Sequence, residues 1–398
     1  MRFLLPLLLT ALATTAFAQN APTPAASAKE QPAMNVRMIL PPEIPAVPGR
    51  EVNIYFDNII LSPVPWQTYL QVDVDCLRGR QEEERFTRTP TTDPSDIGIV
   101  QLTIKFSDMT GKVVAEGKTN LHIYPPDAGK GKAASLLIVG DSLTNASVYP
   151  AELLALCTGD TNPQFTEIGT NITNAATPLM RHEGYGGWQA ATFVNMWGPA
   201  DWNDKHQRTR SPFLFEKDGK PVLDFQKYCD AQNGGKGPDI ITIMLGCNDN
   251  FGAKDETLEA SIDSFEKNMD ILIAEFHRVR PDTKIGIITL LPPAGTQDAF
   301  GNNYGCGQTR WQYRKNQHRV VERTYAKWSG KEAQNIFIIP GLVNLDTMHN
   351  YPTATAPANA RADGAPIVRL ANGVHPAPSG YRQLADTLYC WLKGQMEK

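Results

Sequence analysis

Hydrophobic and polar residues alternate strictly in the first third of the chain. Every second residue from Leu70 to Cys76 is apolar, the residues between them are polar, and Val52–Phe56 and Val100–Phe106 repeat the pattern. A period of two between turn residues is typical of half-buried antiparallel strands. No helical period appears in this region. The pattern therefore predicts a small β-sandwich domain over residues 34–124.

The pattern changes after residues 125–133, a Pro-, Gly- and Lys-rich segment that we interpret as a linker. Nearly continuous apolar runs follow, as in strands buried on both faces of a parallel sheet. These runs are Ser135–Val139, Ile240–Leu245, Ile285–Leu290 and Ile336–Ile339, with Gln164–Ile168 as a candidate fifth. Between them, apolar residues recur at steps of three and four from Leu258 to Phe276, which is one face of a long helix. Alternating strands and helices predict an α/β fold over residues 134–398, with helices on both faces of a parallel sheet.

The N-terminus has the pattern of an exported protein. Arg2 precedes an apolar run, Phe3–Ala13, and the small-x-small sequence Ala16-Phe17-Ala18 follows. This order is typical of a secretory signal peptide, and the run is too short to span a bilayer. We therefore expect residues 1–18 to be cleaved and residues 19–33, rich in Ala, Pro, Gln and Ser, to be a disordered leader. The mature protein is expected to be secreted or periplasmic, with no stable membrane insertion.

Composition narrows the classes of partner. The 38 Lys and Arg residues nearly balance the 42 Asp and Glu residues, and no basic block occurs, which argues against nucleic acid as a partner. The six cysteines show no metal-ligand spacing, and no nucleotide-binding or metal-binding motif is present, so we expect no cofactor and no metal. The sequence determines neither disulfide pairing nor oligomeric state.

Four short motifs follow one another in the α/β region. Ser142 comes directly after the first apolar run, and Gly184–Gly187, Gly246–Asp249 and Asn372–Pro376 follow in that order. In open α/β sheets, ligands bind at the carboxyl ends of the strands. A serine, a glycine, an asparagine and a histidine in separate turns resemble the four blocks of the SGNH (GDSL) hydrolase family.

The resemblance covers roughly residues 134–393 and is to carbohydrate-esterase-like members, here with an extra N-terminal β-domain. It implies a flavodoxin-like three-layer α/β/α sandwich and a carboxylic ester hydrolase that needs no cofactor. It also implies roles for single residues. Ser142 is the expected nucleophile and His375 its base, while the backbone N–H groups of Ser142 and Gly187 and the amide of Asn248 are expected to form the oxyanion hole. Gly186 is a one-residue alternative to Gly187. Asp141 is expected to order the turn.

One position departs from the family pattern. The family usually carries an aspartate three residues before its histidine, and this chain has Asn372 there. An amide accepts a hydrogen bond from the imidazole but cannot offset its charge. Three interpretations stay open. The catalytic group is a Ser–His dyad, with Asn372 or a backbone carbonyl orienting the ring; another acid such as Asp346 or Asp363 supports the ring; or the protein is a catalytically weak relative.

The residues around the motifs bear on the substrate. Tyr185 and Trp188 flank the oxyanion glycines and His182 lies beside them, so we expect these residues to line the substrate pocket. An insertion before the third motif adds more aromatic residues, namely Trp197, Trp202, Phe213 and Phe215. A polar, aromatic rim suits carbohydrate better than a lipid interface. We predict a secreted esterase that removes O-acetyl or other short acyl groups from a glycan. The alternatives are a lipase- or thioesterase-like hydrolase of lipids or other small esters, and a weak, glycan-binding relative.

Overall fold

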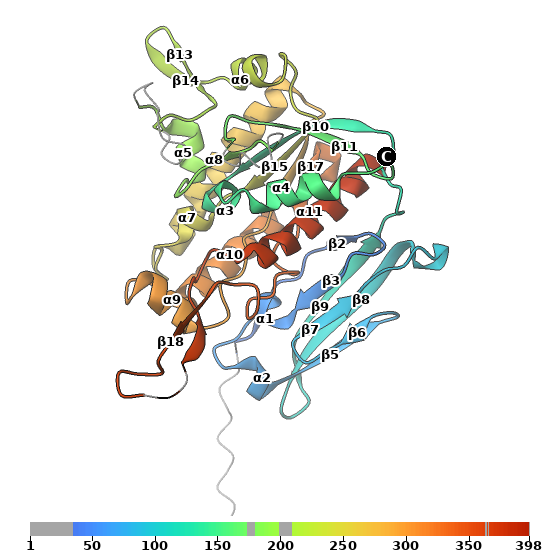
Figure 1. The fold of residues 1–398 in the computed structure, drawn as a ribbon, viewed down its shortest axis with the longest axis vertical. Coiled ribbons are helices and arrows are strands. Elements are labelled where there is room, and N and C mark those ends of the chain that lie inside the picture. Colours follow the sequence, from blue (N-terminus) through green and yellow to red (C-terminus); the bar gives the residue numbers. More distant parts are fainter. Residues whose placement is uncertain (1–34, 173–179, 199–208, 363, 365, 398) are drawn as a thin grey trace, which may run out of the picture. The chain divides into compact units, whose positions relative to one another are not determined.

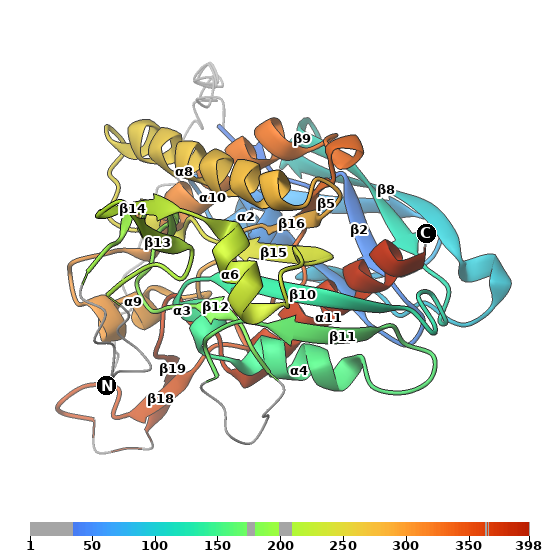
Figure 2. The same cartoon turned by 90° about the horizontal axis from the view of Figure 1, so that it is seen from above.

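A parallel sheet forms the centre of the α/β region (Figures 1 and 2). The computed structural model describes residues 35–172, 180–198, 209–362, 364 and 366–397. The predicted signal peptide and leader, Trp202 and Asp363 lie outside these residues. The five predicted runs are the five strands, in the order β11 (Gln164–Ile168), β10 (Ala133–Gly140), β15 (Ile240–Met244), β16 (Lys284–Ile288) and β17 (Ile336–Ile339), with β12 (Glu183–Gly184) paired beside the end of β10.

Numbered along the chain, this is the 2-1-3-4-5 order of flavodoxin-like folds. The order reverses between β10 and β15, and ligands in such folds bind at that reversal, beyond the carboxyl ends of the strands. Figure 2 shows helices α8 (Leu258–Val279) and α10 (Arg310–Trp328) on one face of the sheet, and α4 (Val148–Leu156) and α11 (Pro378–Glu397) on the other. The predicted three-layer α/β fold with a parallel sheet is therefore confirmed.

Burial explains why the sequence reveals these elements. Leu136, Leu137, Ile138 and Val139 of β10 are all 0% exposed, because neighbouring layers cover both faces of the sheet. Helix α8 instead buries a single stripe, which is the stripe predicted from its spacing: Ile262, Phe265, Met269, Leu272 and Phe276. Polar residues beside this stripe, Asp263 and Glu266, form ion pairs with Arg323 of α10.

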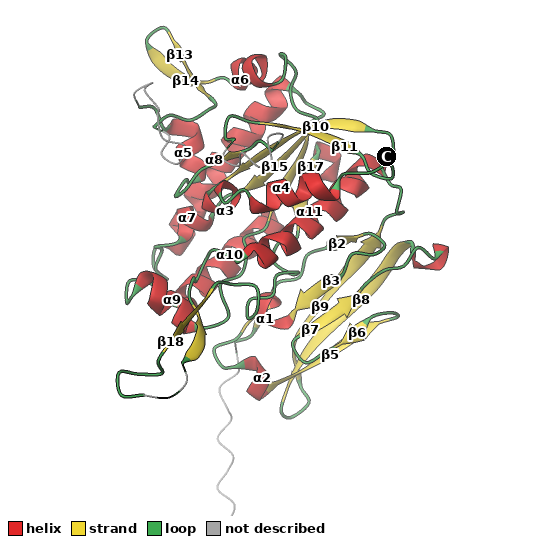
Figure 3. Ribbon diagram, viewed as in Figure 1, coloured by secondary structure: helices red, strands yellow, loops and turns green. Residues whose placement is uncertain are grey.

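The N-terminal region contains three small sheets, as expected for a β-rich region (Figure 3). The largest has the order β2 (Glu43–Ala46), β9 (Val113–Ile123), β8 (Gly98–Asp108), β5 (Leu70–Cys76). The second has the order β3 (Val52–Tyr55), β7 (Arg85–Arg88), β6 (Arg80–Gln81), and the third pairs β1 (Arg37–Met38) with β4 (Ile60–Leu61). Two details correct the sequence interpretation. Strand β2 pairs with β9 in parallel, and Phe56 does not continue its strand but begins helix α1 (Phe56–Ile59). A second short helix, α2 (Trp66–Tyr69), follows. Helices of four residues are too short to show a helical period.

The smaller elements complete the chain. They are β1 (Arg37–Met38), β4 (Ile60–Leu61), η1 (Pro94–Asp96), α3 (Ser142–Asn145), α5 (Ala190–Asn195), β13 (Leu214–Lys217), β14 (Lys220–Leu223), α6 (Phe225–Gln232), α7 (Cys247–Asn250), α9 (Gln297–Tyr304), η2 (Glu332–Gln334), β18 (Thr353–Ala356) and β19 (Ile367–Leu370). All six cysteines are unpaired.

The N-terminal sheets pack against the α/β region, and Asn35–Lys398 forms one compact unit. Asn53 donates to the Asn344 side chain, and Asn58 donates to the carbonyl oxygens of Leu342 and Leu345, just after β17. Within the predicted linker, residues 125–133, a series of turns over 126–131 leads into β10, which begins at Ala133. Its role as a domain boundary stays a prediction.

Candidate active site

Ser142 lies at the carboxyl end of β10, where the strand turns into the short helix α3. Asp141 caps that helix, because its Oδ1 accepts a hydrogen bond of 2.9 Å from the Leu143 backbone N–H. Gly140 is required for packing, since an added Cβ would lie 2.0 Å from Thr144 Oγ1. The Gly-Asp-Ser sequence thus forms a tight turn, and Asp141 orders it, as the sequence predicts.

His375 approaches Ser142 from the loop before α11. Its Nε2 lies 2.9 Å from Ser142 Oγ, although 233 positions separate the two residues. This distance is within hydrogen-bond reach of a general base and its nucleophile. Burial lowers the pKa of His375 below 6.5, so the ring is neutral at neutral pH and can accept the serine proton.

Asn372 makes contacts to the backbone of the same loop. Its Oδ1 accepts hydrogen bonds from the backbone N–H groups of Val374, at 3.0 Å, and His375, at 2.9 Å. Asp346, the alternative acid, bonds elsewhere: its Oδ2 accepts from Tyr55 and lies 3.0 Å from His349 Nδ1. Within the described part of the chain, no side chain makes a hydrogen bond to Nδ1 of His375. Asp363 is not described.

The expected oxyanion donors come from the neighbouring strand and from the loop after β12. Asn248 lies in α7, the short helix that follows β15, and its Nδ2 lies 3.0 Å from the Trp188 carbonyl oxygen and 3.3 Å from Asp141 Oδ2. Gly187 has a φ of 76°, which favours glycine, and an added Cβ would meet nothing within 4 Å. Gly186 does not adopt a positive φ. The structure therefore brings Ser142, Asn248 and the Gly187 turn to one sheet edge.

Asp249 is a contributor that the sequence interpretation passed over. Its Oδ1 accepts a hydrogen bond of 3.1 Å from the Ala190 backbone N–H, and Gln189 Nε2 donates to the Asn248 carbonyl oxygen at 3.0 Å. These contacts join the Gly187 turn to the Asn248 turn. Burial raises the pKa of Asp249 to about 6 and that of Asp141 to about 7. The position of Asp249, an acidic residue directly after Asn248, was the sequence signal that could have indicated this role.

The three candidate pocket-lining residues are buried. His182 is 0% exposed; its Nε2 lies 3.0 Å from Ser147 Oγ, its Nδ1 accepts from the Gly184 N–H, and burial lowers its pKa to about 4. The rings of Tyr185 and Trp188 lie 4.4 Å apart, and both are at most 5% exposed. All three belong to the same short segment as Gly187. Their role in substrate binding stays a prediction.

The described residues lack two further features. No helix there combines the length and the apolar composition needed to cross a membrane. Nor do any three His, Cys, Asp or Glu side chains gather there in a way that suits a metal ion.

Comparison with known proteins places this geometry in a family. Among solved structures, the chain is similar to a family 3 carbohydrate esterase from Clostridium thermocellum, with 15% identity, a TM-score of 0.37, and 65% of this chain and 94% of that one covered. It is also similar to an acetyl esterase variant solved with an acetate ion (16% identity, TM-score 0.37, 66% and 98% covered). A third is an alpha/beta hydrolase enzyme from the metagenome of Lake Arreo, Spain (16% identity, TM-score 0.33, 68% and 99% covered).

No curated protein matches the chain. The family described as GDSL-like Lipase/Acylhydrolase matches residues 136–388, the segment that carries the Ser142 turn, the Asn248 turn and the His375 loop. The chain therefore belongs to the GDSL-like lipase/acylhydrolase (SGNH) family of carboxylic ester hydrolases.

Proposed function

We propose that the protein is a secreted serine esterase that removes O-acetyl or other short acyl groups from carbohydrate. Ester hydrolysis follows from the family, and the observation that carries the catalytic assignment is the 2.9 Å contact between Ser142 Oγ and His375 Nε2. The identity of the acyl group and of the alcohol is the proposed part.

The surroundings of Ser142 support a polar alcohol. The solvent-accessible residues of the neighbouring turns are small or polar: Asn145, Gly186, Gly187, Gln189 and Asn248. The nearby aromatic residues, Tyr185 and Trp188, are buried and present no apolar surface to a lipid. Large exposed apolar patches mark lipid-binding surfaces, and the turns that carry these five residues have none.

The first chemical step is attack by Ser142 Oγ on the ester carbonyl carbon, while His375 Nε2 takes the hydroxyl proton. The negative charge then develops on the former carbonyl oxygen. The backbone N–H groups of Ser142 and Gly187 and the amide of Asn248 are the donors for this oxygen. Asn248 can turn one N–H from Asp141 to the oxyanion, because that 3.3 Å contact is the longer of its two, and it keeps the 3.0 Å bond to Trp188.

Collapse of the tetrahedral intermediate breaks the ester bond, and His375 returns its proton to the departing alcohol. Water, deprotonated by the same imidazole, then attacks the acyl carbon, the bond to Ser142 Oγ breaks, and His375 returns the proton to Oγ as the acid leaves. We assign a Ser–His dyad to both steps, since Asn372 Oδ1 holds two backbone N–H groups and Asp346 bonds other residues. In this assignment Asn372 positions the loop that carries His375.

Acetate release from a panel of O-acetylated polysaccharides tests the proposal. The purified protein is expected to release acetate from at least one polymer, and Ser142→Ala to release none above background. The proposal would be overturned by activity on long-chain lipid esters with no release from any acetylated glycan. Binding of glycan without any turnover of a chromogenic acetyl ester would indicate the weak, glycan-binding relative instead.

Secretion rests on the sequence of residues 1–18, a basic start followed by an apolar run and Ala-Phe-Ala. N-terminal sequencing of protein recovered from the periplasm or medium of the native cell is expected to begin at Gln19. Recovery of chains that keep Met1 in the cytoplasm would refute export.

A further inference from the structure

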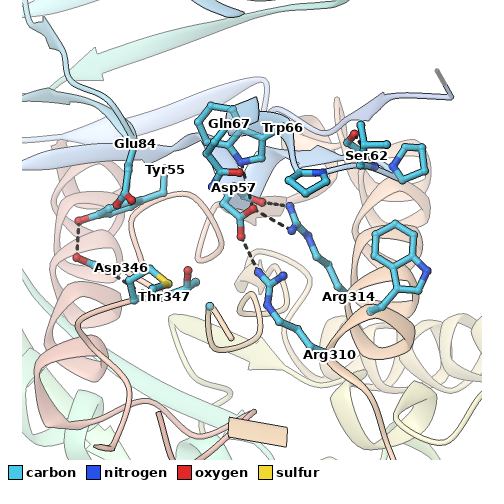
Figure 4. Close-up of a pocket in the computed structure, with 16 residues that line it drawn as sticks. Tyr55, Asp57, Ser62, Trp66, Gln67, Glu84, Arg310, Arg314, Asp346 and Thr347 are labelled. Carbon is cyan, nitrogen blue, oxygen red and sulfur yellow. Dashed lines mark hydrogen bonds and ion pairs between the residues drawn. The ribbon is translucent and has the colours of Figure 1, made fainter. Parts of the chain in front are cut away.

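A cavity of about 440 Å³ lies between the N-terminal region and helix α10 (Figure 4). Its volume falls in the range of about 300–1,000 Å³ that is usual for ligand pockets. Neither Ser142 nor His375 lines it. The N-terminal region contributes Tyr55, Asp57 and Trp66, and α10 contributes Arg310, Trp311 and Arg314.

The charges that face this cavity are largely neutralised inside it. Asp57 forms ion pairs with Arg310 at 2.7 Å and with Arg314 at 2.9 Å, and Figure 4 shows its carboxylate between the two guanidinium groups. Asp346 accepts from Tyr55 and contacts His349. Glu84, the third carboxylate of the wall, is exposed. The wall therefore carries three carboxylates and two guanidinium groups, a balance that disfavours an anionic ligand. A neutral, polar ligand suits this wall.

Aromatic surface adds a second requirement. Trp311 is 42% exposed at the cavity, although most of an indole is apolar. Trp66 is 5% exposed, and its Nε1 donates to Asp57 Oδ1 at 3.2 Å, so the Trp66 side chain is fixed. The exposed indole of Trp311 can stack on a ligand. A flat apolar face beside planar hydrogen-bonding groups matches a pyranose ring, which has apolar faces and hydroxyl groups at its edge.

The cavity also borders the loop that carries the catalytic base. Arg310 Nε donates to the Ala294 carbonyl oxygen at 2.8 Å, and the Ala294 N–H donates to the Gly373 carbonyl oxygen at 3.0 Å. Gly295, the next residue, lines the cavity. One backbone segment therefore forms the cavity wall on one side and supports the histidine loop on the other.

We propose that this cavity binds a neutral sugar unit of the same glycan whose ester is cleaved at Ser142. The inference rests on the proposed function and makes it more specific. It assigns part of the recognition of the polymer to Trp311 and to the interface between the N-terminal region and α10.

The test compares a polymer with a small ester. Trp311→Ala is expected to raise KM for an acetylated polysaccharide about three- to tenfold more than KM for a small chromogenic acetyl ester, as loss of one stacking contact would do. Trp311→Phe should recover most of the difference. Met109→Ala serves as the matched control, since Met109 is a 65% exposed apolar side chain in the turn between β8 and β9 and is not among the cavity residues. Equal changes with both substrates, or no change with either, overturn the inference.

A binding measurement keeps the inference separate from the proposed function. Ser142→Ala protein is titrated calorimetrically with a panel of neutral oligosaccharides that carry no ester. Binding that is lost in Ser142→Ala/Trp311→Ala but kept in Ser142→Ala/Met109→Ala supports the sugar site even if no acetylated polymer is hydrolysed. Binding that Trp311→Ala does not alter, or no binding by any member of the panel, refutes it.

Discussion

The ion pairs of Asp57 offer the sharpest test of how the N-terminal region contributes to catalysis. Asp57 belongs to α1, and it bonds Arg310 and Arg314 on α10 as well as the indole of Trp66. Burial favours the neutral acid, but the guanidinium groups of Arg314 and Arg310 prevail and keep the pKa of Asp57 below its usual range. Asp57→Asn retains the shape and removes the charge.

The magnitude follows from burial. The side chains of Asp57, Arg310 and Arg314 are 25%, 19% and 11% exposed. Removing one partner of a buried ion pair costs about 3–5 kcal/mol, because it leaves the other charge uncompensated. Because the side chains are partly exposed and the Asn amide still accepts hydrogen bonds, we expect Asp57→Asn to cost about 3 kcal/mol of stability, the lower end of this range. For a chain of this length, that loss lowers Tm by about 4 °C.

The effect on activity is expected to exceed what stability alone explains. Without Asp57 to hold it, Arg310 positions Ala294 less firmly, and Ala294 supports Gly373 in the histidine loop. Small displacements of catalytic groups cost up to about 10²-fold in rate. We expect kcat for a small acetyl ester to fall at least tenfold in protein that is still folded at 25 °C, with a smaller change in KM.

Asp386→Asn is the matched control. It removes the charge from an ion pair that joins the same two regions, Arg50–Asp386 at 3.1 Å, but with side chains 40% and 28% exposed. Such surface pairs contribute about 0–1 kcal/mol. Thermal unfolding and steady-state kinetics are measured for both variants. Equal effects of the two variants, or an unchanged kcat in Asp57→Asn, would refute the reasoning.

Three further predictions concern the reaction itself. Asn248→Ala is expected to lower kcat about 10²–10³-fold with little change in KM, since an oxyanion donor acts in the transition state; steady-state kinetics showing a change in KM alone would contradict this. The base must be neutral and burial lowers the pKa of His375, so the loss of kcat/KM that His375 causes should occur only below pH 6.5. Burial raises the pKa of Asp141 to about 7, so Asp141→Asn serves as the control, and an acidic limb above 6.5 that persists in this variant would refute the assignment. Asn372→Asp keeps the oxygen that accepts the two backbone N–H groups and adds a negative charge near the ring, so kcat should rise and the limb should move to higher pH. If the profile of Asn372→Asp matches the parent while Asp346→Asn moves the limb downward, Asp346 rather than the dyad supports the base.

The elements that could be predicted from the sequence are those whose burial requires a regular pattern of apolar residues. Strands β10, β15 and β16 are covered on both faces, so each reads as a nearly continuous apolar run, and β5 and β8 are covered on one face, so each alternates. The edge strand β11 is partly exposed, and its apolar pattern is correspondingly weak. The serine–histidine pair was predictable because each residue belongs to a short motif at a turn. Strand order and the parallel pairing of β2 with β9 depend on contacts between distant segments, which no local pattern records.

The site details that the sequence did not reveal depend on partners far along the chain. Asp57 lies in a four-residue helix and meets Arg310 across 253 positions, so neither residue carries a local signal. Asn372 occupies the position of the family's acid, but its oxygen caps the backbone of its own loop. That choice depends on the loop conformation, which residue type alone does not specify.

Labelling with a serine-directed phosphonate tests the central claim, that His375 activates Ser142 as the nucleophile, most directly. Peptide mapping by mass spectrometry is expected to find the phosphonyl group on Ser142 alone, with a labelling rate at least about 10³-fold lower in folded His375→Ala protein. A label on another serine, or equal labelling rates in the parent and in His375→Ala, would contradict the account.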